Sequence, residues 1–301
     1  KHFGEMVQMD GSFHDWFEDG KISCLMNMVD DATGLTYAQF FDAETTIAAM
    51  RMLWDWIEKY GVPRSLYTDR KNVYVTNLEA TLEEELAGEE PLPAFGKACQ
   101  KLGIHIIEAH SPQAKGRVER KNGVFQDRLI KEMVFNGISG IEAGNQWLKE
   151  RFLDDLNERF SHSPANDVNM HQALLPECDL KNVFVWEDKR VVQGDWLIRW
   201  NNRWFQLLGE SGALPQAKKY VVVQERLDGS IRIVYRSKEL NYKEVQKPGK
   251  KVALFEEEAK KERMVKKPGP NHPWRKMDFR SIKKRMGEKI LAVESAVVGS
   301  P

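Results

Sequence analysis

Three acidic residues lie where predicted core elements end or begin, and their types suit metal-dependent chemistry. Asp10 ends a short apolar stretch, Asp69 ends a second one, and Glu119 falls in the first turns of a long predicted helix. If the two strands are neighbours in one sheet, both aspartates meet at one edge and the helix lays Glu119 over them. Three convergent carboxylates do not stay ionised together without cations, and hard oxygen ligands favour Mg²⁺ or Mn²⁺. The pattern therefore predicts two divalent ions, which would activate an attacking oxygen and stabilise a leaving one at a phosphodiester.

Each acid also has a plainer structural explanation when it is taken alone. Asp10 precedes a glycine and could be a turn residue, Asp69 could cap a strand end, and Glu119 could be a solvated helix position with an ion-pair partner. Asp30 and Asp31 could also supply a carboxylate, but a β-hairpin turn explains this pair better.

Basic and amide side chains crowd the predicted helix around Glu119. Residues 115, 119, 122 and 126 fall on one helical face, and an apolar stripe lies beside that face. A pair between residues 115 and 119 would contribute only about 0.2–0.5 kcal/mol, so a phosphate-contacting role explains the density of charge better. The candidate contacts are Lys115, Arg117, Arg120, Lys121 and Asn122.

Two histidines are accessory candidates. His14 lies four residues after Asp10, and His110 lies just before the long helix. Either could approach a scissile phosphate or a metal-bound water, although a hydrogen-bonded loop histidine is the more ordinary explanation. No Ser-His-Asp, P-loop or GxGxxG pattern is present, so acyl transfer, ATP hydrolysis and dinucleotide chemistry are unsupported.

The elements that must position these residues follow a βββαβαβα order. A helix of about four turns between Thr45 and Gly61 carries Ile47, Met50 and Leu53 at helical spacing. This order predicts an α/β core, and it is the order that RNase H-like domains use. The expected strands cover 7–10, 21–30, 35–41, 65–69 and 104–108, and the other two expected helices cover 95–102 and 111–135.

The C-terminal half changes pattern. A connecting helix over 147–160 has Leu148, Phe152, Leu156 and Phe160 on one stripe. Short strands then follow, with turn signals at 201–202 and 228–229 and a concentration of tryptophan, which predicts a small all-β, SH3-like barrel. The expected divisions are a catalytic core at 1–140, a connecting helix and linker at 141–182, the barrel at 183–246, and a basic, partly disordered tail at 247–301.

Composition limits the possible classes of protein. Hydrophobic residues make up 42% of the 301 residues, which is enough for a core, and no apolar run approaches the roughly 20 residues of a membrane span. Three separated cysteines support neither a disulfide framework nor a zinc finger and fit a reducing, cytoplasmic setting. Lys and Arg balance Asp and Glu at 45 each, but residues 247–301 carry a charge of +8. That tail could hold DNA electrostatically or be merely solvated.

Four sequence motifs resemble those of integrase-core, DDE-type transposases of bacterial insertion sequences, closest to the ISNCY group. The resemblance covers roughly 4–176, and a Pro-Gln-x-x-Gly-x-x-Glu element, which opens the long helix, also resembles the third-acid motif of retroviral integrases. The barrel and the segment NHPWR (271–275) resemble the group more loosely. The motifs are VQMDGSFHDWFE (7–18), VDDATG (29–34), YTDRKNVY (67–74) and HSPQAKGRVERKNGVFQDRL (110–129).

The resemblance implies a function and a set of residues. It assigns Asp10, Asp69 and Glu119 as the catalytic, metal-binding acids of an RNase H-like core, with an acidic insertion at 76–93 lengthening the second interval. It implies metal-dependent cleavage at the ends of an insertion sequence and transfer of the 3′-OH ends into target DNA. It also implies double-stranded DNA and a homo-oligomer as partners, no membrane, no small-molecule cofactor, and a DNA-binding region before Lys1. A nuclease without strand transfer and a domesticated DNA-binding module are the alternatives.

Overall fold

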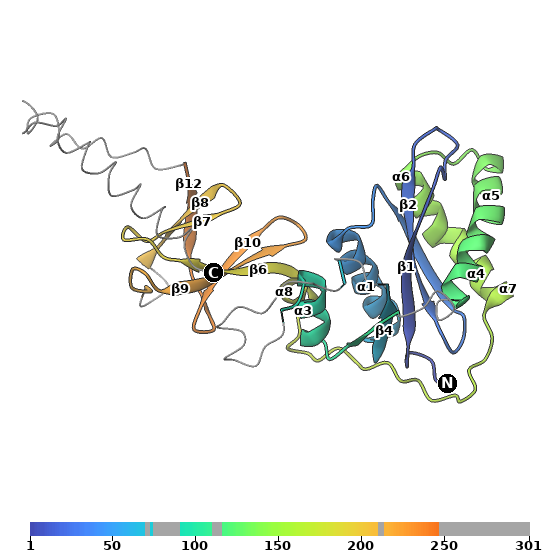
Figure 1. Ribbon diagram of the computed structural model, residues 1–301, viewed down its shortest axis with the longest axis horizontal. Helices are drawn as coiled ribbons and strands as arrows, with labels where there is room; N and C mark the ends of the chain where they lie inside the picture. Colours follow the sequence, from blue (N-terminus) through green and yellow to red (C-terminus); the bar gives the residue numbers. More distant parts are fainter. Residues whose placement is uncertain (70–72, 75–90, 110–115, 210–213, 247–301) are drawn as a thin grey trace, which may run out of the picture. The chain divides into compact units, whose positions relative to one another are not determined.

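The computed structural model describes residues 1–69, 73–74, 91–109, 116–209 and 214–246. Figure 1 follows the chain from blue at the N-terminus to orange near residue 246. Residues Lys1–Lys247 form one compact unit. None of the described helices is both long and apolar enough to cross a lipid bilayer. Most of the acidic stretch, the start of the long helix and the basic tail lie outside the described residues.

A mixed sheet is the centre of the N-terminal part. Its strands are β1 (Val7–His14), β2 (Ser23–Asp30), β3 (Thr36–Phe41), β4 (Ser65–Thr68) and β5 (His105–Glu108). Their order in the five-stranded sheet is β3-β2-β1-β4-β5. The first three strands pair antiparallel, whereas β4 and β5 run parallel to β1. This order and these directions are those of an RNase H-like core, so the predicted fold class is confirmed.

Helices cover both faces of this sheet. Figure 1 shows α1 (Thr46–Tyr60) on one side of β1 and α4 (Gly116–Val124) on the other. Every residue of β2 is buried, because this strand lies inside the sheet with helices on both sides. A strand that is buried on both faces has a nearly continuous apolar sequence and not an alternating one. The β2 sequence is of this continuous kind.

Helix α1 begins and ends where the sequence predicts, but its buried face is different. The Thr45 side chain accepts a hydrogen bond from Ala48 N at 3.1 Å, and the helix ends at Gly61, whose φ is 100°. Ile47 was expected on the buried stripe and is 43% exposed. The buried face includes Ala48 and Ala49, which a search for large apolar residues overlooks.

The two predicted long helices are each interrupted by a π-helical turn. The first runs through α4, η2 (Phe125–Leu129) and α5 (Ile130–Phe135). The second runs through α6 (Ile141–Trp147), η3 (Leu148–Phe152) and α7 (Leu153–Phe160). Phe160 was expected on a buried stripe with Leu148 and is 40% exposed. Phe160 is the last residue of α7, and each step of four residues in an α-helix rotates about 40°, so the apolar stripe drifts away from the core side toward this end.

The outer edge of the sheet is closed by two asparagines. Asn145 on α6 accepts from the backbone N–H of Phe40 at 2.6 Å and donates to the carbonyl of Phe40 at 2.9 Å. Asn157 on α7 does the same at Thr36, at 2.7 and 2.8 Å. Both partners belong to β3, the edge strand, so part of its outward hydrogen-bonding capacity is satisfied within the chain.

The C-terminal strands form two further sheets around one hydrophobic core. One has the order β11-β10-β9-β6 and the other β12-β8-β7, so the predicted barrel consists of two sheets. The predicted turns are present: Asn201 and Asn202 have φ of 44° and 60°, and Gly229 has φ of 79°. The strands are β6 (Val185–Val191), β7 (Leu197–Trp200), β8 (Arg203–Leu207), β9 (Tyr220–Arg226), β10 (Ile231–Tyr235), β11 (Lys238–Glu239) and β12 (Tyr242–Val245).

Two short helices complete the described elements, α3 (Ala94–Lys101) and α8 (Leu180–Val183). Lys101 Nζ at the end of α3 lies 2.8 Å from Glu187 Oε2 on β6. Phe184, which follows α8, belongs to the core of the N-terminal part and packs against Trp54 with ring centroids 5.7 Å apart. The division of the chain into four segments stays a prediction.

Candidate active site

Asp10 and Asp69 lie level with each other on neighbouring strands. The parallel register pairs Val7 with Leu66 and Gln8 with Tyr67, and the same offset places Asp10 opposite Asp69. Residues that are level in parallel strands present their side chains on the same face of the sheet. Asp10 lies within β1 and Asp69 directly follows β4, and the charges of both act on Tyr74.

Tyr74 and Glu44 lie beside this pair. The Tyr74 hydroxyl, 1% exposed as a residue, donates to Glu44 Oε1 at 3.1 Å. Burial, the charge of Glu44 and then the charges of Asp69 and Asp10 raise the pKa of Tyr74 well above its ordinary value. The phenol therefore remains a protonated hydrogen-bond donor near several carboxylates.

Sequence analysis did not single out Glu44. Its carboxylate lies against the backbone of Gly11: a Cβ there would be 2.6 Å from Glu44 Oε2 and 3.0 Å from the Cys24 sulfur. Glu44 directly precedes the N-cap Thr45, so the one signal available was an acid at the entrance to a helix that packs on the sheet. The glycine after Asp10 is thus required by a close approach, not by a turn as the plainer explanation had it, because it lies inside β1.

Helix α4 lies along β1 through three polar contacts in step. Val118 N donates to Gln8 Oε1 at 3.3 Å, Asn122 Nδ2 donates to Asp10 Oδ2 at 3.2 Å, and Gln126 Nε2 on η2 donates to Ser12 Oγ at 3.4 Å. Four residues of a helix rise about 6 Å, and two residues of a strand rise about 6.6 Å. Every second side chain of β1 therefore meets every fourth residue of the helical segment.

Asn122 is held on both of its amide atoms. Its Oδ1 accepts from Asn27 Nδ2 at 2.5 Å, while its Nδ2 donates to Asp10. Asn27 is fully buried on β2 and is the register partner of Asp10. This chain of contacts fixes the orientation of the Asn122 amide, so that its N–H group faces the Asp10 carboxylate.

Glu119 is placed less closely than the two aspartates. It lies in the first turn of α4 and is exposed. No three metal-ligating side chains form a group that could hold an ion among the residues that the structure describes. The donor set itself, carboxylate oxygens from Asp10, Asp69 and Glu119, fits Mg²⁺ or Mn²⁺.

The predicted phosphate contacts do not form one exposed face. Arg117 Nε pairs with Asp31 Oδ1 at 3.0 Å, and the exposed Arg120 bonds the carbonyl of Gly116 through Nε at 2.8 Å. Lys121 is only 9% exposed, and Asn122 faces Asp10. Lys115 lies outside the described residues.

The remaining candidate residues that the structure describes, His14 and Asp30, make packing contacts or hydrogen bonds within the fold. The His14 ring packs edge-on against Trp16, with centroids 5.4 Å apart. Asp30 is buried and accepts hydrogen bonds from Gly4 N, Thr33 N and Thr33 Oγ1 at 2.8–2.9 Å, so the preferred turn explanation holds for it. His110 lies outside the described residues.

Two curated proteins are similar to most of this chain. It is 32% identical to y4bF of Sinorhizobium fredii, a transposase by name, over 244 residues, which is 80% of this chain and 52% of that protein. It is 30% identical to the transposase for insertion sequence IS1202 of Streptococcus pneumoniae over 287 residues, 93% of this chain and 60% of that protein. The chain thus spans between half and two thirds of each relative. No family model matches it.

Solved integrase structures also resemble the chain, but distantly. The match to the HTLV-2 integrase catalytic core domain in complex with magnesium covers 50% of this chain and 89% of the integrase chain, at 18% identity and a TM-score of 0.38. The match to the simian T-cell lymphotropic virus intasome in complex with PP2A regulatory subunit B56 gamma covers 82% of this chain and 81% of the chain it matches, at 17% identity and a TM-score of 0.39. These scores are low, so the fold assignment rests on the strand order.

Proposed function

Because the chain is a relative of insertion-sequence transposases, we propose that it is the catalytic and C-terminal part of a DDE transposase. The reaction would be metal-dependent cleavage at the ends of an insertion sequence, followed by transfer of the 3′-OH ends into target DNA. The observation that carries the proposal is the level placement of Asp10 and Asp69, with α4 laid along the same face of β1.

Glu119 is proposed as the third acid because of its position round α4. Side chains on a helix are about 100° apart per residue, which puts Glu119 about 60° from Asn122 and Lys121 about 100° away on the opposite side. Lys121 shares a cavity with Val29 of β2. In the order β3-β2-β1-β4-β5, the flank away from β2 is the flank nearest β4 and Asp69.

The chain's own groups would bind and orient the reacting DNA. Two Mg²⁺ or Mn²⁺ ions, when bound by Asp10, Asp69 and Glu119, would supply charge stabilisation for the attacking and leaving oxygens. Asn122 holds the Asp10 carboxylate in a fixed orientation. Lys115, Arg117, Arg120 and Lys121 are proposed to contact phosphates, which positions DNA but carries little sequence information.

The proposal includes the partners. Double-stranded DNA, as element ends and as target, is the substrate, and a homo-oligomer would hold two ends together. The two sheets of residues 183–246 are proposed to bind DNA or another subunit. A basic tail at 247–301, with a charge of +8, would add electrostatic affinity.

Three isosteric variants test the proposal on the full chain with Mg²⁺, using an uncut duplex end to measure cleavage and a pre-cut end to measure joining. Asp10→Asn, Asp69→Asn and Glu119→Gln should each abolish cleavage and joining, because each removes a ligand of the ions, while duplex affinity in chelator persists. Asp127→Asn is the matched control, since Asp127 lies on η2 in an exposed pair with Lys131. Near-control strand transfer in one variant would refute that residue's role. Cleavage without joining by the unsubstituted chain would instead assign a nuclease.

A further inference from the structure

A basic cavity lies on the flank of α4 that faces away from Glu119. Its volume is about 300 Å³, and none of the described residues that line it is acidic. On the α4 side the cavity is lined by Arg117, Arg120 and Lys121. On the opposite side it is lined by Phe160, the last residue of α7, and by His162, two residues further along the chain. Phe160 and His162 belong to no motif that suggested chemistry, so the fold adds them to the basic cluster.

The wall of the cavity opposite α4 is held in place by specific contacts. His162 N donates to the carbonyl of Thr33 at 2.9 Å, which ties the start of the linker to the β2–β3 turn. Gly34, with φ of 70°, lies under the imidazole: a Cβ there would be 3.5 Å from His162 Cε1. The imidazole is therefore packed on the turn and held at the cavity.

Lys121 is the unusual member of the cluster. It is only 9% exposed, and its buried Nζ has no hydrogen-bond partner within the described part of the chain. Keeping an ammonium group away from water without a hydrogen-bond partner costs free energy. The Phe160 ring, with its centroid 5.3 Å from Nζ, offsets part of that cost. A buried cation without a hydrogen-bonded anion is an unsatisfied group, and a bound anion would satisfy it.

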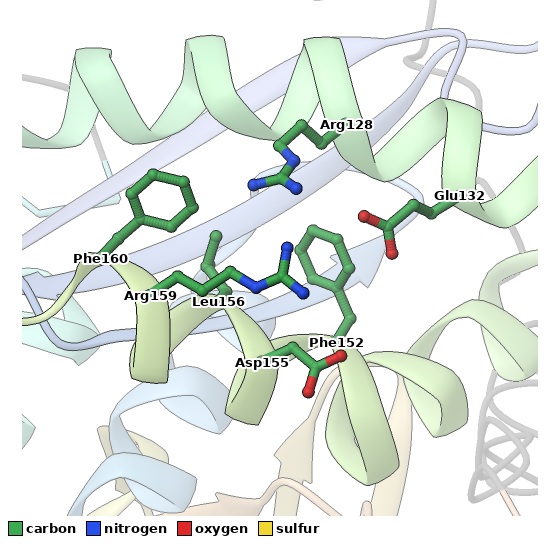
Figure 2. A pocket seen from close by; sticks show the side chains of 7 residues that line it. All are labelled: Arg128, Glu132, Phe152, Asp155, Leu156, Arg159 and Phe160. Atoms are coloured by element: carbon green, nitrogen blue, oxygen red, sulfur yellow. The ribbon is translucent and has the colours of Figure 1, made fainter.

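The neighbouring pocket on the other side of Phe160 provides a contrast. Figure 2 shows Arg128 and Arg159 directed toward each other from two helical segments, with the carboxylates of Glu132 and Asp155 beside them. That pocket has a volume of only about 30 Å³ and holds as many acidic as basic side chains. It needs no external anion. In the larger cavity, Arg117 is paired with Asp31 at 3.0 Å, and among the described residues neither Arg120 nor Lys121 has an acidic partner.

We propose that this cavity binds one phosphate group of the DNA backbone, with Lys121 and Arg120 as its charged contacts and His162 as a further donor. The identity of the ligand as DNA rests on the proposed function. Lys121 directly precedes Asn122, whose amide contacts Asp10, and a helix is about 10–12 Å wide. The phosphate would therefore lie on the strand close to the reacting position, on the β2 side of α4. The flexible stem of lysine lets the ammonium turn from Phe160 to the phosphate.

The first arm of the test uses inorganic phosphate and measures thermal unfolding of the full chain. Phosphate is compared with chloride at equal ionic strength. The unsubstituted chain should gain stability as phosphate rises, because a ligand that binds only the folded state stabilises it. Lys121→Met should melt at least as high in chloride but lose the phosphate effect. Lys131→Met, which removes an exposed lysine paired with Asp127, should keep it. An equal phosphate effect in the Lys121→Met and Lys131→Met proteins would overturn the site.

The second arm measures duplex binding in chelator across a salt series, so it does not depend on catalysis. Lys121→Met and Arg120→Gln should each lower the log–log salt slope by about one unit, equally for specific and random duplexes. Arg120 is exposed, so its variant tests the site without threatening the fold. Loss of the phosphate effect with unchanged slopes would mean a free-anion site and would overturn the assignment to DNA. If the Asp10→Asn protein kept its strand-transfer activity, the proposed function would be refuted, whereas the phosphate and duplex-binding tests could still give the expected results.

Discussion

Asn122 donates a hydrogen bond to Asp10 and accepts one from Asn27, so a single amide joins the central strand, its neighbour and the helix above them. The amide N–H faces a carboxylate, whereas the carbonyl oxygen faces a buried amide. A flipped amide would direct its oxygen at the carboxylate and lose both contacts. The contact with Asp10 therefore sets the orientation of the Asn122 amide, and that amide in turn holds one oxygen of the Asp10 carboxylate.

Asn122→Ala should lower the rate of strand transfer by about 10- to 100-fold. A hydrogen bond to a charged group is worth about 1.5–3 kcal/mol, and each 1.4 kcal/mol is a factor of ten in rate if the loss falls on the transition state. Duplex affinity in chelator should stay within about twofold. The Mg²⁺ concentration for half-maximal activity should rise, because the carboxylate is less well oriented. An unchanged Mg²⁺ dependence together with a lower melting temperature would make Asn122 a purely structural residue.

Gly11→Ala and Gly123→Ala should have opposite effects on the free energy of unfolding. A methyl at Gly11 meets Glu44 Oε2 at 2.6 Å and should destabilise the fold by about 1–3 kcal/mol. At Gly123, inside α4, nothing lies within 4 Å, so alanine should stabilise by about 1 kcal/mol. Urea unfolding of the two variants is the measurement. A neutral Gly11→Ala variant would show that the Glu44 carboxylate moves aside freely.

Tyr74→Phe should destabilise the fold at pH 7 by about 1–2 kcal/mol, because the hydroxyl donates to Glu44. The pH dependence has a definite sign. The folded pKa is raised, so Tyr74 contributes stability that is present at neutral pH and is lost as pH rises beyond about 10, the ordinary tyrosine value. The difference between the two proteins should therefore shrink in alkali. Parallel urea titrations at pH 7 and above 10 would measure this, and a constant difference would contradict it.

Asn157→Ala should cost about 1–3 kcal/mol, since it leaves the backbone N–H and C=O of Thr36 without their side-chain partner. Asn136→Ala is a suitable control, because Asn136 is exposed and bonds the carbonyl of Glu132 in its own helical segment. Unfolding and light scattering of both variants would be compared. If the two variants unfold and scatter alike, Asn157 does not protect the edge.

The strand positions of the site could be predicted from sequence, because apolar runs that end on an acid are local signals. Asp69 directly follows β4 as expected, whereas β1 continues past Asp10 to His14, so the prediction located the first strand but ended it too early. The parallel register brings the two positions level. Asn122 shows what local signals omit. Helical spacing predicts a shared face with Glu119 and a contact to DNA, whereas its contact with Asp10 depends on the phase between α4 and β1, which is a tertiary property.

The buried charges and the small residues were beyond reach of the sequence for physical reasons. Lys121 looks like its exposed neighbour Arg120 in the sequence, and its burial depends on tertiary neighbours such as the Phe160 ring of α7. Ala48 and Ala49 carry little hydrophobic weight in a pattern, yet they face the core. Likewise, Glu44 lies in a connection with no chemical motif and is brought to the site by the packing of α1.

The hydrogen bonds of Asn145 and Asn157 to the main chain of β3 limit how copies of the chain can associate. An incoming strand that extended the sheet would need the main-chain groups of Thr36 and Phe40, which Asn157 and Asn145 already occupy. Extension across β3 would have to expel both amides first. Association of copies by extension of this sheet is therefore opposed at β3, which leaves β5, the other edge strand, and the side-chain surfaces as places where two copies could meet.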